Sequence, residues 1–251
     1  MVKPTAIFHV RTDIVGAILI RRWLNENVPG FAPEWIIEAD LESDFFADHL
    51  MKVSSIMQKG YVAQSALALA AIRRWQLHDV ALLAGGRPAP LSPTPDQVKY
   101  YTDIRPEAVE EATNQGYNAL RVDVRSEADL EKIADSETLI GTGLIHFLPD
   151  EALTSVFISL AQAGIKQAVF NNGGLPPNQT NAEFQIFVDT FIRLGHPLFI
   201  RSVEQMAALL PDGWEITDAC EIDDLLPYME PVGEKLRGMP SLFNTYLFSQ
   251  V

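Results

Sequence analysis

The sequence predicts an α/β fold, a doubly wound sheet of seven mostly parallel strands with a helical cap at the N-terminus. The main observation is the stretch from Val98 to Asn172, which alternates strand and helix patterns throughout its length. Strands that are connected by single helices run parallel in one sheet. Their carboxyl ends should therefore lie along a common edge, where sheets of this kind bind ligands.

The strand that opens this stretch, residues 98–102, is rich in β-branched and aromatic residues and ends at Asp103. Pro106 stands where the first turn of a helix tolerates a residue without an N–H group. The residues that follow favour a helix, and Gly116 is a typical C-terminal stop. The sequence thus indicates a strand–helix unit with an aspartate at the end of its strand.

A second unit of the same kind follows at once. Residues 119–122 form its strand, which closes on Asp123, and Ser126 is placed to cap a helix. The apolar face of that helix includes Leu130 and Ile133, which are three positions apart. An aspartate again ends the strand.

The next strand, residues 138–140, runs into the turn Gly141–Asp150. Residues 151–162 then carry the apolar stripe of a helix, and residues 167–170 form the next strand, which ends at Asn171-Asn172. We therefore expect polar groups from four neighbouring strands to line one rim of the sheet.

The first 76 residues have mostly helical patterns, and we expect them to form a cap on a core of residues 77–251. Residues 33–58 alternate acidic and apolar side chains as an amphipathic helix does. Two interpretations of its aromatic residues stay open: a packed stripe under a solvated face, or the lining of a substrate pocket. Residues 61–75 are dense in Ala and Leu and predict a helix buried against the sheet.

The first strand of the core begins at His78 and is followed by Gly85 and Gly86. A glycine pair at this place lets a ligand approach the backbone closely, because no Cβ intervenes. Residues 87–96 contain four prolines where a doubly wound fold usually has a helix that faces the ligand. We expect at best a short helix there.

The C-terminal part predicts a helix over residues 203–210, capped by Ser202, and two final strands over residues 214–222 and 245–251. The segment 223–241 between these strands is polar and poorly patterned. It predicts a mobile flap.

Composition narrows the possible partners. A net charge of −14 argues against nucleic acid and favours a small molecule or another protein. The single cysteine excludes an internal disulfide, and no His or Cys has metal-ligand spacing, so we expect no metal. Without a signal or membrane-spanning pattern, we expect a cytoplasmic protein with no membrane association. The oligomeric state, including a homodimer, stays open.

Three motifs and a strand pair support a family resemblance: Tyr101-Thr-Asp103-Ile-Arg-Pro-Glu-Ala-Val109, Val122-Asp123-Val124, Gly143-Leu-Ile-His146-Phe-Leu-Pro-Asp150, and the closing strands within Trp214–Val251. From Val80 to Val251 the chain resembles class I S-adenosylmethionine-dependent methyltransferases. That family usually has an acidic residue followed by Ser-Pro-Glu-Ala, an aspartate after the third strand, a His-x-Leu-Pro-Asp turn, and an antiparallel closing hairpin. The resemblance implies a Rossmann-like methyltransferase fold.

The resemblance also implies a cofactor, S-adenosyl-L-methionine, and methyl transfer to a small-molecule acceptor. Asp103 would accept hydrogen bonds from the ribose hydroxyls, and Asp123 from the adenine amine. Ile104 would pack on the adenine, and Val124 would add backbone contacts. The full set of implied cofactor-binding residues is Gly85, Gly86, Asp103, Ile104, Asp123, Val124, Gly141, Thr142 and Gly143.

His146 is the candidate catalytic residue, because some members of the family have a general base or a substrate-orienting group at this place. The unperturbed pKa of a histidine suits proton removal near neutrality. Methyl transfer is an in-line displacement, so most of the catalysis would come from alignment. A structural role for His146 in the core stays an open alternative.

The glycine-rich first motif is degenerate. Family members usually have an acidic residue two positions before the first glycine of a Gly-x-Gly-x-Gly loop. In the corresponding run Leu82-Leu83-Ala84-Gly85-Gly86, Leu82 holds the acidic position, Ala84 holds that of the first glycine, and only Gly86 clearly fits a loop glycine. A catalytically inactive methyltransferase-like protein with a binding or scaffolding role is therefore the alternative. A nicotinamide-linked oxidoreductase ranks third, because Gly85-Gly86-Arg87-Pro88 does not supply Gly-x-Gly-x-x-Gly.

Overall fold

The structure, a computed structural model, describes residues 8–9, 36–37, 66–85, 88, 91–173, 199, 201–230, 233–237 and 243–251. Strands β1 (Phe8–His9) and β2 (Ile36–Ile37) pair in parallel as a separate two-stranded sheet. Residues 66–75 are helical, as predicted. The rest of the predicted N-terminal cap lies outside the described residues.

Ile36 and Ile37 correct one detail of the sequence prediction, since they form a strand inside a segment whose pattern indicated a helix. Both are β-branched, which favours the extended backbone. A strand of two residues is too short to outweigh helical periodicity in a pattern read over a longer window.

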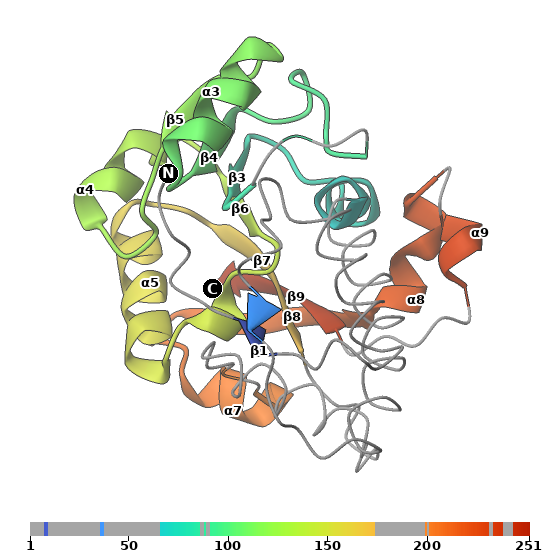
Figure 1. The fold of residues 1–251 in the computed structure, drawn as a ribbon. Helices are drawn as coiled ribbons and strands as arrows, with labels where there is room; N and C mark the ends of the chain where they lie inside the picture. Colours follow the sequence, from blue (N-terminus) through green and yellow to red (C-terminus); the bar gives the residue numbers. More distant parts are fainter. Residues whose placement is uncertain are drawn as a thin grey trace.

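The core of the protein is a seven-stranded sheet with the strand order β5-β4-β3-β6-β7-β9-β8 (Figure 1). Its strands are β3 (Val80–Leu83), β4 (Tyr100–Asp103), β5 (Ala119–Arg121), β6 (Thr138–Gly141), β7 (Gln167–Gly173), β8 (Trp214–Glu221) and β9 (Phe243–Gln250). Strands β3 to β7 pair in parallel, whereas β9 is antiparallel to both β7 and β8. The predicted doubly wound, mostly parallel sheet of seven strands is confirmed.

The strand order reverses at β3, which lies between β4 on one side and β6 on the other. Helices cover both faces of the sheet, with α5 on one side and the helix of residues 66–75 on the other (Figure 1). A reversal point of this kind opens a crevice at the carboxyl ends of the strands. In this chain the reversal lies at the carboxyl ends of β3 and β6.

Beyond residues 66–75, the described helices are α3 (Pro106–Asn114), α4 (Glu127–Leu130), η2 (Glu131–Ile133), η3 (Ile145–Phe147), α5 (Asp150–Gln162), α7 (Val203–Ala208), α8 (Ile222–Leu225), η4 (Leu226–Tyr228) and α9 (Gly233–Leu236). The predicted helices form as α3, α4 with η2, α5 and α7, and further short helices form where the sequence predicts none. Gly116 ends the α3 region with a φ of 89°, and the Ser126 side chain accepts from the backbone N–H of Asp129. At Ser202 a capping box with Gln205 starts α7.

Alternate residues of the central strands pack into two separate cores. Leu83 belongs to the core under α5, and Leu82 belongs to the core under the helix of residues 66–75. The α5 side is built around the ring of Phe157, whose centroid lies 5.8, 5.4 and 4.9 Å from those of Phe170, Trp214 and Phe248. Burial on both faces is what holds a parallel sheet together.

The predicted flap over residues 223–241 is wrong for residues 223–228 and for residues 233–236, which form α9. Residues 222–228 form α8 and η4, and Ile222, Leu225, Leu226 and Met229 are buried against the helix of residues 66–75. Their spacing is that of one helical face, and Pro227 ends the α-helical hydrogen bonding after one turn. In the described part of the chain, no helix combines the length and apolar character that a membrane span requires.

Candidate functional site

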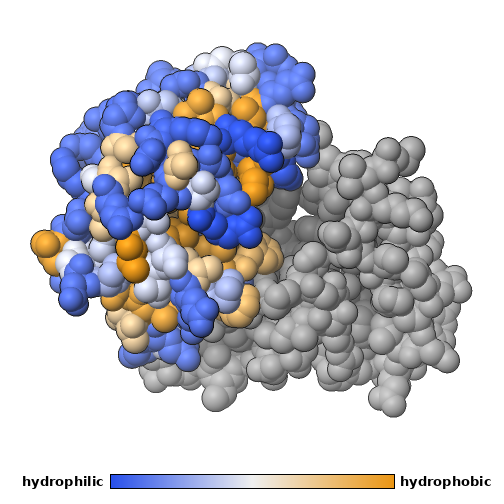
Figure 2. Space-filling view, turned by 90° about the vertical axis from the view of Figure 1, so that its left-hand side faces the viewer, coloured by the Kyte–Doolittle hydropathy of each residue, from blue (hydrophilic) through white to orange (hydrophobic). Residues whose placement is uncertain are grey.

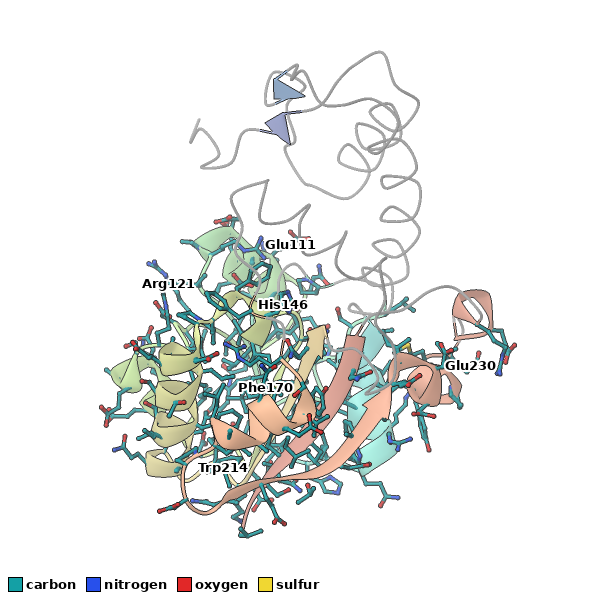
Figure 3. All side chains as sticks on the ribbon, turned by 90° about the horizontal axis from the view of Figure 1, so that it is seen from below. Glu111, Arg121, His146, Phe170, Trp214 and Glu230 are labelled. Carbon is teal, nitrogen blue, oxygen red and sulfur yellow. The ribbon has the colours of Figure 1, made fainter. Side chains whose placement is uncertain are left out.

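Strand register aligns the predicted site residues along the carboxyl edge of the sheet. Asp103 at the end of β4 pairs with Arg121 at the end of β5, and Leu83 at the end of β3 pairs with Gly141 at the end of β6. In Figure 3, His146 lies near the level of Arg121 at the end of β5, and Trp214 lies away from both. The register thus places Asp103 and Gly141 at the carboxyl edge of the sheet, and Asp123, Gly143 and His146 follow the ends of β5 and β6 in the chain, whereas Gly86 lies outside the described residues.

Asp103, the predicted ribose acceptor, is buried and already holds hydrogen bonds within the chain. Its Oδ1 accepts from the backbone N–H of Arg105 at 2.9 Å and from Nε of Arg105 at 3.0 Å, and its Oδ2 accepts from Nη2 at 3.3 Å. Arg105 itself is 55% exposed. Ile104, between the two, is 43% exposed and presents an apolar surface at the rim. The carboxylate of Asp103 is therefore held at the rim by Arg105, whose long side chain has many rotamers.

Asp123 repeats this arrangement at the neighbouring strand end. Its Oδ1 accepts from the backbone N–H and Nε of Arg125 at 3.0 and 2.9 Å, and its Oδ2 accepts from Nη2 at 2.7 Å. Hydrogen bonds from Arg125 hold the pKa of Asp123 below its ordinary value. Val124 is buried in the core under α5 and leaves only its backbone for a ligand. The Asp-x-Arg spacing is legible in the sequence and is the signal for both ion pairs.

Gly85 is a glycine because of Tyr101. A Cβ at this position would lie 2.5 Å from the ring of Tyr101, whose hydroxyl donates to the carbonyl oxygen of Gly85 at 2.7 Å. The backbone N–H of Gly85 donates to the carbonyl of Thr102 at 2.9 Å. Packing inside the protein therefore accounts for this glycine.

The proline-rich segment after β3 contains no helix in its described residues, 88 and 91–98. A turn forms where the backbone N–H of Gln97 donates to the carbonyl of Thr94 at 2.9 Å. The hydroxyl of Tyr117 donates to the carbonyl of Pro93 at 2.7 Å and ties the segment to the core. The expected loss of a ligand-facing helix end here is confirmed for these residues.

The loop after β6 is held by the end of β7. A Cβ on Gly141 would lie 2.7 Å from the ring of Phe170, so the ring packs directly on the glycine backbone. Gly143 has a φ of 67°, which favours glycine, and its backbone N–H donates to Oδ1 of Asn171. Thr142, between the two glycines, is buried. The loop thus has a defined conformation at the crevice.

His146 lies in η3, immediately after this loop, and its side chain is buried. Its ring centroid is 4.3 Å from that of Phe147, which is 47% exposed. Burial, and secondly the positive charge of Arg201, lower the pKa of His146 from 6.5 to about 4. The unperturbed pKa assumed from the sequence is therefore wrong for this imidazole, which is neutral at pH 7 and accepts a proton reluctantly.

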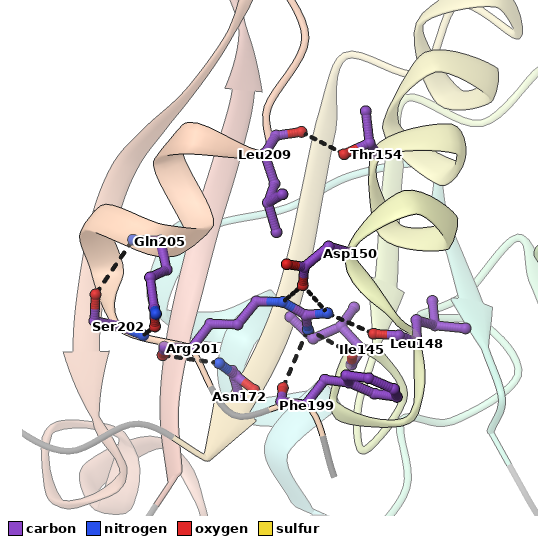
Figure 4. A network of polar contacts seen from close by, with 10 residues as sticks. All are labelled: Ile145, Leu148, Asp150, Thr154, Asn172, Phe199, Arg201, Ser202, Gln205 and Leu209. Carbon is purple, nitrogen blue, oxygen red and sulfur yellow. Dashed lines mark hydrogen bonds and ion pairs between the residues drawn. The ribbon is translucent and has the colours of Figure 1, made fainter. Parts of the chain in front are cut away.

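Arg201 contacts the turn that carries His146, and no sequence pattern singles it out. It is 4% exposed and ion-paired with Asp150 at the start of α5 at 2.8 Å (Figure 4). The partners are 51 positions apart in the chain, so the pairing has no local signal.

On the face shown in Figure 2, hydrophilic residues predominate and apolar residues form small patches between them. Among the described residues, no group of three His, Cys, Asp or Glu side chains could hold a metal ion. Cys220 is buried, which raises the pKa of its thiol to about 12 and keeps it protonated. Neither feature adds a reactive group to the rim.

No protein-family model matches the sequence, and no curated protein matches it. Solved structures do share its fold. A DUF574 family protein from Streptomyces avermitilis MA-4680 matches with a TM-score of 0.61 at 11% identity, over 85% of this chain and 93% of that one. The mitomycin 7-O-methyltransferase MmcR matches with a TM-score of 0.52 at 15% identity, over 83% of this chain and 58% of that one.

A third structure is the magnesium protoporphyrin IX methyltransferase ChlM from Synechocystis PCC 6803 with bound SAH. It matches with a TM-score of 0.51 at 12% identity, over 94% of both chains. At these identities the matches establish the fold. The chain has the Rossmann-like class I methyltransferase fold that its motifs imply.

Proposed function

Starting from the class I methyltransferase fold, we propose that the protein transfers a methyl group from S-adenosyl-L-methionine to a small-molecule acceptor. The observation that carries this proposal is the placement of Asp103 at the end of β4 and of Asp123 two residues after the end of the adjacent strand β5. These ends adjoin the crevice where the strand order reverses. In ChlM, a protein of the same fold, the solved structure contains SAH.

The residues present at the rim fit an adenosine group. The carboxylate of Asp103 has two oxygens that can accept from two hydroxyls, and the exposed side chain of Ile104 offers an apolar surface for a planar base. Arg105 is more than half exposed and can leave the carboxylate for water. We propose that these residues and Asp123 hold the adenosine end. When bound, the cofactor supplies an electrophilic methyl group.

We propose that His146 orients the acceptor. A neutral imidazole accepts a hydrogen bond from an O–H or N–H group, and the lowered pKa keeps His146 neutral throughout the physiological range. The same burial makes it a weak proton acceptor, so its main contribution would be alignment of the acceptor with the methyl group. The proton of the acceptor would then pass to solvent after the methyl group is transferred.

A catalytically inactive binding or scaffolding protein is the second candidate, and specific observations favour it. Both rim carboxylates are already paired with arginines, and the buried Leu82 stands where the family has an acidic residue. The helix that usually faces the cofactor after β3 is missing from the described residues of that segment. These features weaken the part of the site that would hold the methionine moiety.

Calorimetric titration with S-adenosylhomocysteine tests the proposal. We expect binding by the wild-type protein and a loss of about 1.5–3 kcal/mol in the Asp103→Ala variant, the scale of hydrogen bonds to a charged group. Asp135→Ala is the matched control, because Asp135 forms an exposed ion pair with Lys99 away from the rim. Binding that is undetectable at millimolar concentration would reject methyl transfer and favour the binding protein. Equal affinities of the wild type and the Asp103→Ala variant for S-adenosylhomocysteine would show that Asp103 does not bind the ribose.

A further inference from the structure

Arg201 is a buried cation whose three guanidinium nitrogens all donate hydrogen bonds (Figure 4). Nε and Nη2 contact Oδ1 of Asp150, each at 2.8 Å. Nη1 donates to the carbonyl oxygens of Ile145 and Phe199, both at 3.1 Å, and Nη2 donates to the carbonyl oxygen of Leu148. A guanidinium offers five N–H donors in a rigid plane, and here that plane is fully used.

These contacts surround His146. Ile145 precedes it and Leu148 follows it by two positions, so Arg201 holds the turn on both sides of the imidazole. The backbone N–H of Phe199 also donates to the carbonyl oxygen of His146 at 2.8 Å. The segment that contains Phe199 and Arg201 therefore braces the backbone of His146 itself.

The same residue is tied to the sheet. The carbonyl oxygen of Arg201 accepts from Nδ2 of Asn172 at 3.0 Å, at the end of β7. Arg201 thus connects the end of β7, the turn of η3 and the first residue of α5. Three elements at this edge of the sheet are joined through one residue, β7 through its backbone carbonyl and the other two through its buried side chain.

Stability alone is a poor reason for this arrangement. Asp150 is 64% exposed, so the carboxylate is largely hydrated while the guanidinium is not. Burying a cation is costly unless it is fully bonded, and apolar residues of similar volume often serve a core equally well. What a planar, fully bonded guanidinium adds is a fixed geometry for the groups around it.

We propose that Arg201 is a positioning residue, which fixes the turn from Ile145 to Leu148 so that the imidazole of His146 keeps one orientation at the strand edge. The inference rests on the proposed function only where it takes His146 as the residue that orients the methyl acceptor. The contacts of Arg201 exist whether or not a methyl group is transferred.

The guanidinium also affects the pKa of the imidazole. Its positive charge adds to burial in lowering the pKa of His146, and Asp150, the charged neighbour at the start of α5, is engaged by Arg201 itself. After burial, the positive charge of Arg201 is the second cause of the lowered pKa of His146. A loosened or uncharged residue 201 should therefore be visible in the titration of His146.

The test is an NMR titration of isotope-labelled histidine side chains in the full chain between pH 5 and pH 8. In the wild type, His146 should not titrate above pH 5. Arg201→Met removes the charge and the bonds, and the pKa of His146 should rise by about one unit or more. Arg201→Lys keeps the charge but cannot reach the same carbonyls, so a rise in this variant reports an imidazole that has become less buried.

Arg237→Met is the matched control, because it makes the same replacement in an exposed pair with Glu234. If Arg201→Met does not fold, Arg201→Lys carries the test. A wild-type titration of His146 in every folded Arg201 variant would overturn the proposal. Absence of S-adenosylhomocysteine binding combined with a shifted His146 titration would leave the positioning role intact and reject methyl transfer, so the two failures are distinguishable.

Discussion

Replacing His146 with glutamine should remove one specific pH dependence from the stability of the fold. In the folded protein, burial and then the charge of Arg201 lower the pKa of His146 to about 4, whereas the unfolded chain has the ordinary value of 6.5. Between these values the unfolded chain binds more protons than the folded one. The free energy of unfolding therefore falls as the pH falls through this window.

The size of the effect follows from the two pKa values. At pH 8 the imidazole is neutral in both states, and at pH 5 it is mostly protonated in the unfolded chain and mostly neutral in the folded one. The difference amounts to RT ln[(1 + 10^1.5)/(1 + 10^−1)], or about 2 kcal/mol. This is a large fraction of the stability of a typical domain.

Urea unfolding at pH 5, 6, 7 and 8 measures the effect in the wild type and in His146→Gln. The range stays above the sequence pI of about 4.7, where the protein would carry no net charge. The wild type should lose about 2 kcal/mol more than the variant between pH 8 and pH 5. His78 is exposed, so His78→Gln is the matched control for loss of a histidine. Parallel pH profiles for the wild type and His146→Gln would refute the reasoning, because they would mean that the folded imidazole titrates normally.

Three further substitutions test the rim and its supports. Gly141→Ala should destabilise the fold by about 1–3 kcal/mol in urea unfolding, because its Cβ would meet the ring of Phe170; an unchanged midpoint would show that the ring moves aside. Ser202→Ala should cost about 1 kcal/mol by the same assay through loss of the capping box, and no loss would mean that the cap is replaced by water. Arg105→Ser should tighten S-adenosylhomocysteine binding up to about fivefold in calorimetry, because it frees Asp103 from an ion pair; weaker binding would show that Arg105 assists the carboxylate.

The parts of the fold that the sequence predicts well depend on signals a few residues apart. Pro106 and Gly116 bound a helix because each acts on its own backbone, and Ser202 caps α7 through a residue three positions away. The seven strands and their rim follow from the same local patterns together with the rule that crossover helices make strands parallel. Local chemistry was therefore sufficient for the architecture of the core.

The features that escaped prediction depend on competing or distant groups. Apolar residues 222–229 have helical spacing, but Pro227 and polar neighbours mask it, and burial against the helix of residues 66–75 decides the outcome. The pKa of His146 depends on burial by the whole fold and on Arg201, which lies 55 positions away in the sequence. No local sequence pattern predicts the burial of residues 222–229 or the pKa of His146.

The two Asp-x-Arg pairs change what an experiment on this site can decide. Because Arg105 and Arg125 satisfy the rim carboxylates from within the chain, the fold has no need of a cofactor to neutralise Asp103 or Asp123. Their ion pairs would look the same in an enzyme awaiting its cofactor and in a binding protein that has none. Stability measurements therefore cannot distinguish the two functions, and affinity can: the sign of the Arg105→Ser effect shows whether an adenosine competes with Arg105 for Asp103.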